Sequence, residues 1–314
     1  MKLAFNSLRS GLANNGGTRT ILKCCQVINK LGHQCDVLAQ NDRFTWFKHK
    51  KPLPYVPADL DVMIAVACSD AAMTVGRKDE FRKAWYIRAH EDWAMTEEDL
   101  INIYRVPNML NIVNSRGLQR KLLSYNADSV VVYQGIDFDW WENRRLRPKN
   151  RIRIGALHTK QPRKRWKDFV KLAKILGTDK YEYVGMGSAT PKNAGFLTDF
   201  KENANVEELN NLYSSCHVWF APTENEGLHN VSMEAALCGC LVVCAREPLN
   251  GMMYDYAFDG KTAMIYDKKN IQQAAELIKD PDWSLIPNMQ DHLRSGIGTR
   301  EENMGKMLGI LEEL

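Results

Sequence analysis

Apolar and polar positions follow one another along this chain in the order of a parallel α/β protein. Short apolar runs, about as long as buried strands, alternate with segments whose apolar residues recur at helical spacing. The clearest unit has an apolar run at 217–221, a polar loop at 222–230, a helical segment at 231–238 and a second apolar run at 240–245. This order predicts strand, loop, helix and strand of one parallel sheet. Such sheets bind ligands at the carboxyl ends of their strands, so the loop is a candidate site.

The beginning of the chain has a second unit of the same kind. An apolar run at 2–8 is followed by a glycine-rich loop at 9–17, a segment of helical spacing from Thr18, and a further apolar run at 34–40. This predicts a Rossmann-like half. It lacks G-x-G-x-x-G and an acid at the end of its second strand, so nicotinamide binding is poorly supported. Further strands are expected at 61–67, 85–89, 111–114, 130–133, 152–157, 181–186 and 263–266.

Length and composition narrow the class of protein. A chain of 314 residues with 45% apolar and 25% charged residues suits two globular domains of ordinary composition. It has no apolar run long enough for a membrane span, and its first residues do not resemble a signal peptide. The eight cysteines show no metal-ligand spacing. We therefore expect buried, reduced thiols in a cytoplasmic protein that holds no metal.

The polar loop and the helix after it carry residues suited to an activated sugar. Asn230 is a favourable N-cap, and the free amides and dipole of a helix start attract phosphate. Gly227 lets the backbone approach a ligand closely. Glu226 precedes the helix, and Glu234 lies about one turn inside it. Carboxylates beside a phosphate are repelled unless they bind hydroxyls, so a diphosphate with a sugar at each end, a nucleotide sugar, fits both.

At these residues the chain resembles a known family. The stretch ENEGLHNVSMEAALCGCLVV is similar to the E-x7-E signature of family 4 retaining glycosyltransferases, although His229 and Cys240 stand where many members have proline. The resemblance implies the α/β GT-B fold, two Rossmann-like parallel-sheet domains facing an interdomain cleft. We expect an acceptor-side domain at 1–143, a nucleotide-sugar-binding domain at 144–295, and a C-terminal helix at 296–314 that packs back on the first domain.

The resemblance also implies roles for single residues. In the second domain Glu234 would hold the ribose hydroxyls and Glu226 the transferred sugar. The first domain would contribute Gly16 and Gly17 to the cleft, with Arg19 close by, and His90 beside the donor sugar or the acceptor. The remaining donor contacts would be Gly227, Leu228, His229, Asn230 and Gly185.

The segment from residue 144 to 167 has eleven lysines and arginines and no acid. The family has an arginine here and a lysine five residues later, and both bind the leaving diphosphate. Lys160 and Arg165 have this spacing with the two types exchanged, and we assign them to the diphosphate. Arg163 and Lys164 are the alternatives. The run would also suit a polyanion, such as DNA or an acidic membrane surface.

The reaction implied by the resemblance is retaining transfer of a sugar from a UDP- or GDP-sugar to a hydroxyl. The acceptor would be a glycan, a lipid-linked sugar or a hydroxymethylated base in DNA. No Asp-x-Asp stands at a strand end, and we expect neither a metal nor a cofactor. Two alternatives stay open: a sugar-nucleotide epimerase or hydrolase of the same fold, and a nucleotide-sugar-binding protein without catalysis. The expected location is cytoplasmic, with peripheral contact to a membrane surface compatible with the basic run.

Overall fold

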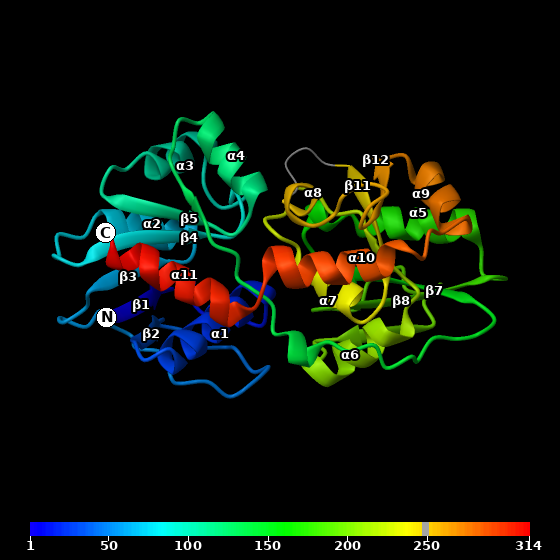
Figure 1. Ribbon diagram of the computed structural model, residues 1–314, viewed down its shortest axis with the longest axis horizontal. Coiled ribbons are helices and arrows are strands. Elements are labelled where there is room, and N and C mark those ends of the chain that lie inside the picture. The colour runs from blue at the N-terminus through cyan, green and yellow to red at the C-terminus, as the bar shows by residue number, and fades with distance from the viewer. Residues whose placement is uncertain (247–250) are drawn as a thin grey trace. The chain divides into compact units, whose positions relative to one another are not determined.

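The computed structural model describes residues 1–246 and 251–314 and separates them into two compact units (Figure 1). Unit 1 comprises Met1–Ile136 and Gly298–Leu314, and unit 2 comprises Asp137–Ile297. The first division falls before the predicted boundary at residue 143, and the second falls just after the predicted boundary at residue 295. The C-terminal helix belongs to unit 1.

Unit 1 is a parallel sheet of six strands in the order β2-β1-β3-β4-β5-β6. Both faces are covered, since alternate residues of β4 enter different cores. Ala84 and Tyr86 pack with helices α1 and α11, whereas Trp85 and Ile87 pack with α2, α3 and α4. The bounds are β1 Lys2–Asn6, α1 Gly16–Lys30, β2 Gln34–Leu38, β3 Val62–Ala65, α2 Cys68–Val75, β4 Arg82–Ile87, α3 Glu97–Tyr104, β5 Met109–Val113, α4 Arg116–Ser124, β6 Val130–Val131 and α11 Arg300–Glu312.

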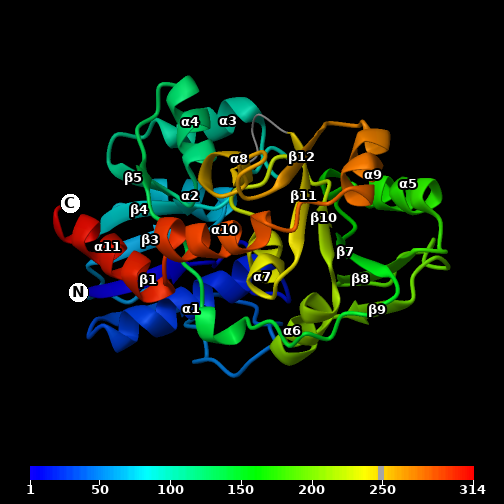
Figure 2. The same cartoon turned by 45° about the vertical axis from the view of Figure 1, so that its right-hand side comes forward.

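Unit 2 is a second parallel sheet of six strands, in the order β12-β11-β10-β7-β8-β9. In β10, Phe220 faces the core formed with α5 and α9, and Trp219 contacts Tyr213 of α6. Figure 2 shows α5 and α9 on one side of the sheet and α6 on the other. The bounds are β7 Ile152–His158, α5 Trp166–Leu176, β8 Tyr181–Gly187, β9 Asp199–Glu202, α6 Val206–Ser215, β10 Val218–Ala221, α7 Asn230–Leu237, β11 Leu241–Arg246, α8 Met252–Asp255, β12 Met264–Asp267, α9 Ile271–Lys279 and α10 Leu285–His292.

Several local expectations need correction. The first helix begins at Gly16 rather than Thr18, because Asn15 is its N-cap and accepts a hydrogen bond from the backbone of Thr18. In α7, Asn230 is the first helical residue, and His229 occupies the N-cap position without a side-chain capping bond. Strand β9 was not predicted, since its sequence Asp-Phe-Lys-Glu is polar at both ends and lies at the edge of the sheet.

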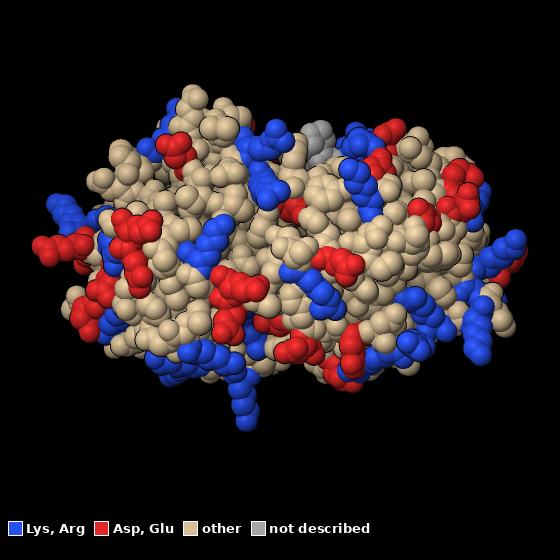
Figure 3. Space-filling model, viewed as in Figure 1, with Lys and Arg blue, Asp and Glu red and all other residues tan. Residues whose placement is uncertain are grey.

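All eight cysteines lie in the described part of the chain, where they are buried and form no disulfide bond. Among the described residues, no helix has both the length and the apolar character that crossing a bilayer requires. In Figure 3, blue and red side chains are interspersed over the face drawn there, as expected for a net charge of only +4.

Candidate functional site

The candidate loop and the basic run meet at the carboxyl ends of two neighbouring strands. β7 and β10 pair in parallel, so the segments that follow them, 159–165 and 222–229, leave the sheet at the same edge. The backbone N–H of Glu224 donates to the carbonyl of Arg163 at 2.9 Å. Nη1 of Arg163 donates to the carbonyl of Asn225 at 3.2 Å. These bonds hold the two segments together.

A buried ion pair lies at the centre of this arrangement. Nζ of Lys164 is 2.5 Å from Oε1 of Glu226, and the hydroxyl of Thr223 donates to the same oxygen. Nη1 of Arg163 is 3.7 Å from Oε2. Glu226 is only 7% exposed. Burial opposes its ionisation, but the positive charges of Lys164 and Arg163 outweigh burial and lower the pKa of Glu226 to about 2.

Glu234 lies on α7, one turn after the helix begins, as the sequence predicted. It is buried, and the hydroxyl of Tyr213 on α6 donates to Oε2 at 3.2 Å. Gly227 and Leu228 are also buried. Both glutamates of the motif are therefore held in place by neighbouring side chains, one by a cation and the other by a tyrosine.

His229 begins α7 in an uncommon conformation. Its φ of 40° lies in the left-handed region, which disfavours residues with a Cβ. Nδ1 lies 2.8 Å from the hydroxyl of Ser232, and the carbonyl accepts a hydrogen bond of 3.1 Å from Tyr256. Burial and the charge of Lys164 lower the pKa of His229 to about 3. The imidazole is therefore neutral at physiological pH.

The structure separates the cations proposed for the diphosphate. Lys164 and Arg163, the alternatives, lie against Glu226. Arg165 instead has φ of 51° and spans two carboxylates: its Nε is 2.5 Å from Asp168, and its Nη1 is 2.5 Å from Glu224. Lys160 is exposed. Spacing along the chain did not reveal this difference because residues 162–164 form a turn of 3-10 helix, which changes the side that each side chain faces.

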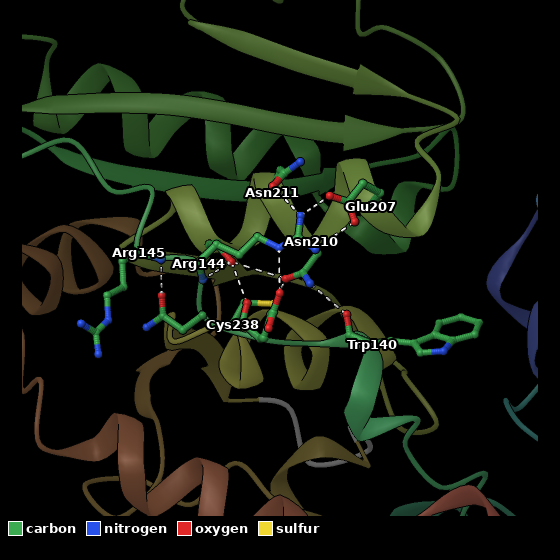
Figure 4. A network of polar contacts seen from close by, with 10 residues as sticks. Trp140, Arg144, Arg145, Glu207, Asn210, Asn211 and Cys238 are labelled. Carbon is green, nitrogen blue, oxygen red and sulfur yellow. Dashed lines mark hydrogen bonds and ion pairs between the residues drawn. The ribbon is translucent and has the colours of Figure 1, made fainter.

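Several arginines of the basic run have partners inside unit 2, among them Arg144 (Figure 4). Arg144 forms an ion pair with Glu207 on α6 and donates to Asn211 at 2.9 Å. Nε of Arg147 donates to the carbonyl of Cys216 at 2.9 Å. Arg153 is 2.8 Å from Glu182. Partners inside unit 2 therefore occupy these three arginines, and contact of the run with a polyanion such as DNA or an acidic membrane surface stays a prediction.

Segment 137–147 is attached to α6 and the end of α7 by further polar contacts. The carbonyl of Trp140 accepts from Asn210 at 3.0 Å, and the hydroxyl of Ser214 donates to the carbonyl of Glu142 at 2.9 Å. The thiol of Cys238 lies 3.1 Å from the amide oxygen of Asn210, and Figure 4 shows Asn210 between Cys238 and Trp140. The segment is thus a part of unit 2 rather than a free linker.

Gly185, for which a donor contact is predicted, lies beside two aromatic side chains. A Cβ at this position would lie 2.8 Å from the ring of Phe200 and 3.1 Å from that of Trp166. The space that the glycine leaves is filled by these aromatic side chains. In the structure Gly185 accordingly makes room for core packing at the end of β8.

In unit 1, Gly16 and Gly17 form the first turn of α1, which contains no acidic residue. A Cβ on Gly17 would lie 2.7 Å from Nη1 of Arg88, a residue that the sequence reading missed. Arg88 follows β4, donates to the carbonyl of Val66 at 2.8 Å, and has a buried Nε without a partner. Burial lowers the pKa of this guanidinium. No signal in the sequence pointed to Arg88, because the predicted strand at 85–89 contains it, whereas β4 ends at Ile87.

His90 also follows β4, but it belongs to an aromatic cluster. It is 6% exposed, and its Nδ1 lies 3.2 Å from the hydroxyl of Tyr104. Its ring centroid is 5.9 Å from that of Tyr125.

Among the described residues there is no group of three or more His, Cys, Asp or Glu arranged to hold a metal ion.

The part of unit 2 that carries the candidate site matches a known protein family. Residues 151–280, which include β7, β10 and α7, match the model of the family described as "Glycosyl transferases group 1". No curated protein sequence matches the chain.

Solved structures are similar over nearly the whole chain. A sucrose-phosphate synthase from Thermosynechococcus elongatus has a TM-score of 0.80 at 14% identity, with 100% of this chain and 98% of that chain covered. Anabaena HepE, in complex with UDP-glucose, has a TM-score of 0.78 at 14% identity, with 99% and 100% covered. An alpha-glucosyltransferase in complex with UDP and a 13-mer DNA has a TM-score of 0.65 at 14% identity, with 99% and 100% covered. The chain therefore has the GT-B fold, built from two Rossmann-like parallel-sheet units.

Proposed function

We propose that this chain is a retaining glycosyltransferase, which moves a sugar from a UDP- or GDP-sugar to an acceptor hydroxyl without a metal or a cofactor. The observation that carries the proposal is the buried Lys164–Glu226 pair beside the start of α7, with Glu234 one turn further along the helix. The match of residues 151–280 to a glycosyltransferase family and the fold support it. An ordinary capped loop would have no need of a buried cation and two buried carboxylates at one sheet edge.

The leaving group of the reaction sets what the site has to provide. Negative charge grows on the diphosphate oxygens as the bond to the sugar breaks, and fixed cations and helix-start amides stabilise it. Lys164 has three N–H donors and uses one on Glu226, so two are available to phosphate oxygens. Arg163 and the first amides of α7 would add to this. Loss of one such donor typically costs about 10²–10³ in rate.

The two glutamates would bind opposite ends of the donor. Glu226 is ionised, because its pKa is lowered to about 2, so it accepts hydrogen bonds from hydroxyls of the transferred sugar. Glu234 would accept from the ribose hydroxyls. In this proposal neither glutamate acts as a nucleophile. The acceptor hydroxyl attacks on the face from which the diphosphate leaves, and a phosphate oxygen takes its proton.

For the acceptor we propose a glycan or a lipid-linked sugar ahead of a hydroxymethylated base in DNA. One structurally similar alpha-glucosyltransferase was solved with DNA. In the present chain, however, Arg144, Arg147 and Arg153 are bound to groups of unit 2. Lysines and arginines bind DNA by neutralising its phosphates and releasing the counterions condensed on it, and these three arginines already have partners in unit 2.

The test is a donor screen by mass spectrometry. Each of several UDP- and GDP-sugars is offered with a glycan, a lipid-linked sugar and hydroxymethylated DNA. Glu226→Ala should abolish transfer while the nucleotide still binds in calorimetry, and Glu226→Gln, which keeps the volume, guards against a folding defect. Glu276→Ala, at an exposed position on α9, is the matched control and should transfer normally.

The other outcomes would refute the proposal in different ways. Unchanged turnover in Glu226→Ala would remove the assigned role of this residue. A donor that is isomerised or hydrolysed without an acceptor would identify an epimerase or a hydrolase. Nucleotide binding without transfer to any of the three acceptors would indicate a binding protein.

A further inference from the structure

Tyr213 of α6 is held rigidly inside unit 2. Its side chain is fully buried. Its ring meets that of Trp219 on β10 edge to face, with centroids 5.1 Å apart, and the centroid of Trp141 lies 5.7 Å away. A side chain packed in this way cannot change rotamer without displacing its neighbours. The hydroxyl of Tyr213 therefore has a fixed position.

This hydroxyl has two acceptors within reach but only one hydrogen to donate. Oε2 of Glu234 lies 3.2 Å away, and Sδ of Met186 lies 3.4 Å away. A thioether sulfur is a weak acceptor, whereas the charge of a carboxylate strengthens a hydrogen bond. We therefore assign the hydrogen to the bond with Glu234.

The surroundings of Glu234 indicate that this carboxylate serves a ligand. Glu234 is 6% exposed, and its neighbours on α7, Met233 and Ala235, are buried apolar residues. A buried carboxylate is costly, and an apolar side chain at position 234 would pack α7 against α6 without that cost. Glutamate also has much rotamer freedom to lose on binding. A hydrogen bond from a fixed donor orients the carboxylate before a ligand arrives, which lowers that loss.

We propose that Tyr213 is a positioning residue, whose hydroxyl orients the carboxylate of Glu234 toward the ribose hydroxyls of the donor and so makes the site select ribonucleotides. This inference rests on the proposed function, which assigns Glu234 to the ribose. An ionised carboxylate has about four acceptor positions, so the bond from Tyr213 is compatible with further bonds from the ribose. A nucleotide without these hydroxyls leaves an oriented, buried acceptor unsatisfied, which weakens its binding.

The selection can be measured by isothermal titration calorimetry of the full chain. The ligands are UDP and GDP and the 2′,3′-dideoxy form of each, and the quantity is the ratio of the Kd of the dideoxy form to that of the ribonucleotide. For the nucleotide that binds, the wild-type ratio should be roughly tenfold or more, the effect of losing hydrogen bonds to a charged group.

Tyr213→Phe removes the hydroxyl and keeps the ring that packs against the two tryptophans. The ratio should fall by roughly threefold to tenfold, the effect of one hydrogen bond. The Kd of the dideoxy form should change little, because that ligand does not use the orientation of Glu234. A merely structural role of Tyr213 would instead weaken both forms equally and leave the ratio unchanged.

Tyr183→Phe is the matched control. Tyr183 is also fully buried in unit 2, but its hydroxyl donates to the carbonyl of Gly177 at 2.6 Å rather than to Glu234. Its replacement should leave the ratio at the wild-type value. Differential scanning calorimetry shows whether each variant is folded.

Glu234→Ala is an independent variant that keeps Tyr213 and tests the acceptor of the same bond. Its ratio should fall at least as far as that of Tyr213→Phe. Adding Tyr213→Phe to Glu234→Ala should lower the ratio no further, because the hydroxyl then has no carboxylate to orient.

The outcomes separate this inference from the proposed function. A wild-type ratio in Tyr213→Phe or in Glu234→Ala would overturn the inference even if the chain transfers sugar. A wild type that binds neither UDP nor GDP would refute the proposed function, and the inference with it. The predicted ratios in a chain that transfers no sugar to any acceptor would support the inference and refute the proposed transfer reaction alone.

Discussion

Removing the ammonium of Lys164 should destabilise unit 2 strongly, because it leaves a buried carboxylate behind. The side chains of Lys164 and Glu226 are 12% and 8% exposed, so solvent screens their interaction little. The pKa of Glu226 falls from 4.5 to about 2 in the folded state, which corresponds to about 3 kcal/mol of stability. The same figure is the lower end of the range for breaking a buried ion pair. Arg163, 3.7 Å from the other oxygen, keeps the loss at that lower end.

The assay is differential scanning calorimetry of the full chain, following the transition of unit 2. Lys164→Met keeps most of the aliphatic stem and should lower the Tm of this transition by about 6–12 °C at pH 7, using about 2–4 °C per kcal/mol for a unit of this size. Lys160→Met is the matched control. Because Lys160 is exposed, its replacement should change stability by no more than about 0.5 kcal/mol.

Adding Glu226→Gln to Lys164→Met tests whether the unpaired carboxylate causes the loss of stability. If the loss comes from an unpaired carboxylate, adding Glu226→Gln to Lys164→Met should restore part of the Tm. If the two substitutions instead add their losses, or if Lys164→Met behaves like Lys160→Met, the buried pair is not what stabilises the loop. Acid should also destabilise unit 2. The pKa of the Glu226 carboxyl is lower in the folded state, so its contribution to stability is complete above about pH 4.5 and is lost as the pH falls through about 2.

Two further predictions test the roles assigned to Lys160, Arg165 and Gly185. Arg165→Ala breaks the ion pairs of Arg165 with Asp168 and Glu224 and so frees the loop that carries Glu226. The kcat for sugar transfer should therefore fall about tenfold or more. The kcat of Lys160→Ala should stay within about twofold of the wild type. Equal losses in these two variants would restore the original assignment of both cations to the diphosphate. Gly185→Ala places a methyl group 2.8 Å from the ring of Phe200 and should cost about 1–3 kcal/mol in unfolding experiments, while the KM for the donor of the folded variant stays unchanged. A raised KM without loss of stability would instead place Gly185 at the nucleotide.

The two-unit parallel α/β architecture was predictable because a parallel strand is buried on both faces. Runs such as 218–221 and 241–245 are continuously apolar, and their cores cover both sides of the sheet. The edge strand β9 carries no such run and was missed. Capping was less predictable. Asn230 has the right side chain for an N-cap, yet the chain enters α7 through His229 in a left-handed conformation that tertiary contacts with Ser232 and Tyr256 hold.

In the candidate site, too, some features follow from the sequence and others only from the tertiary structure. The spacing of Glu226 and Glu234 around a helix start is a property of the sequence, and the structure places both where that spacing predicts. The identity of the cation opposite Glu226 is not such a property. Lys160, Lys164 and Arg165 all lie after the same strand, and they differ only in the direction that a short turn gives to each side chain.

The sequence by itself thus determined the succession of buried strands, the loop that bears the acidic motif and the helix behind it, because these follow from local periodicity. Only the tertiary structure decided which charges neutralise one another. Arg144 meets Glu207, and Lys164 meets Glu226, across more than sixty residues of chain in each case. The energy of a charge depends on its burial and on the groups within a few ångströms of it, and folding alone brings these groups together.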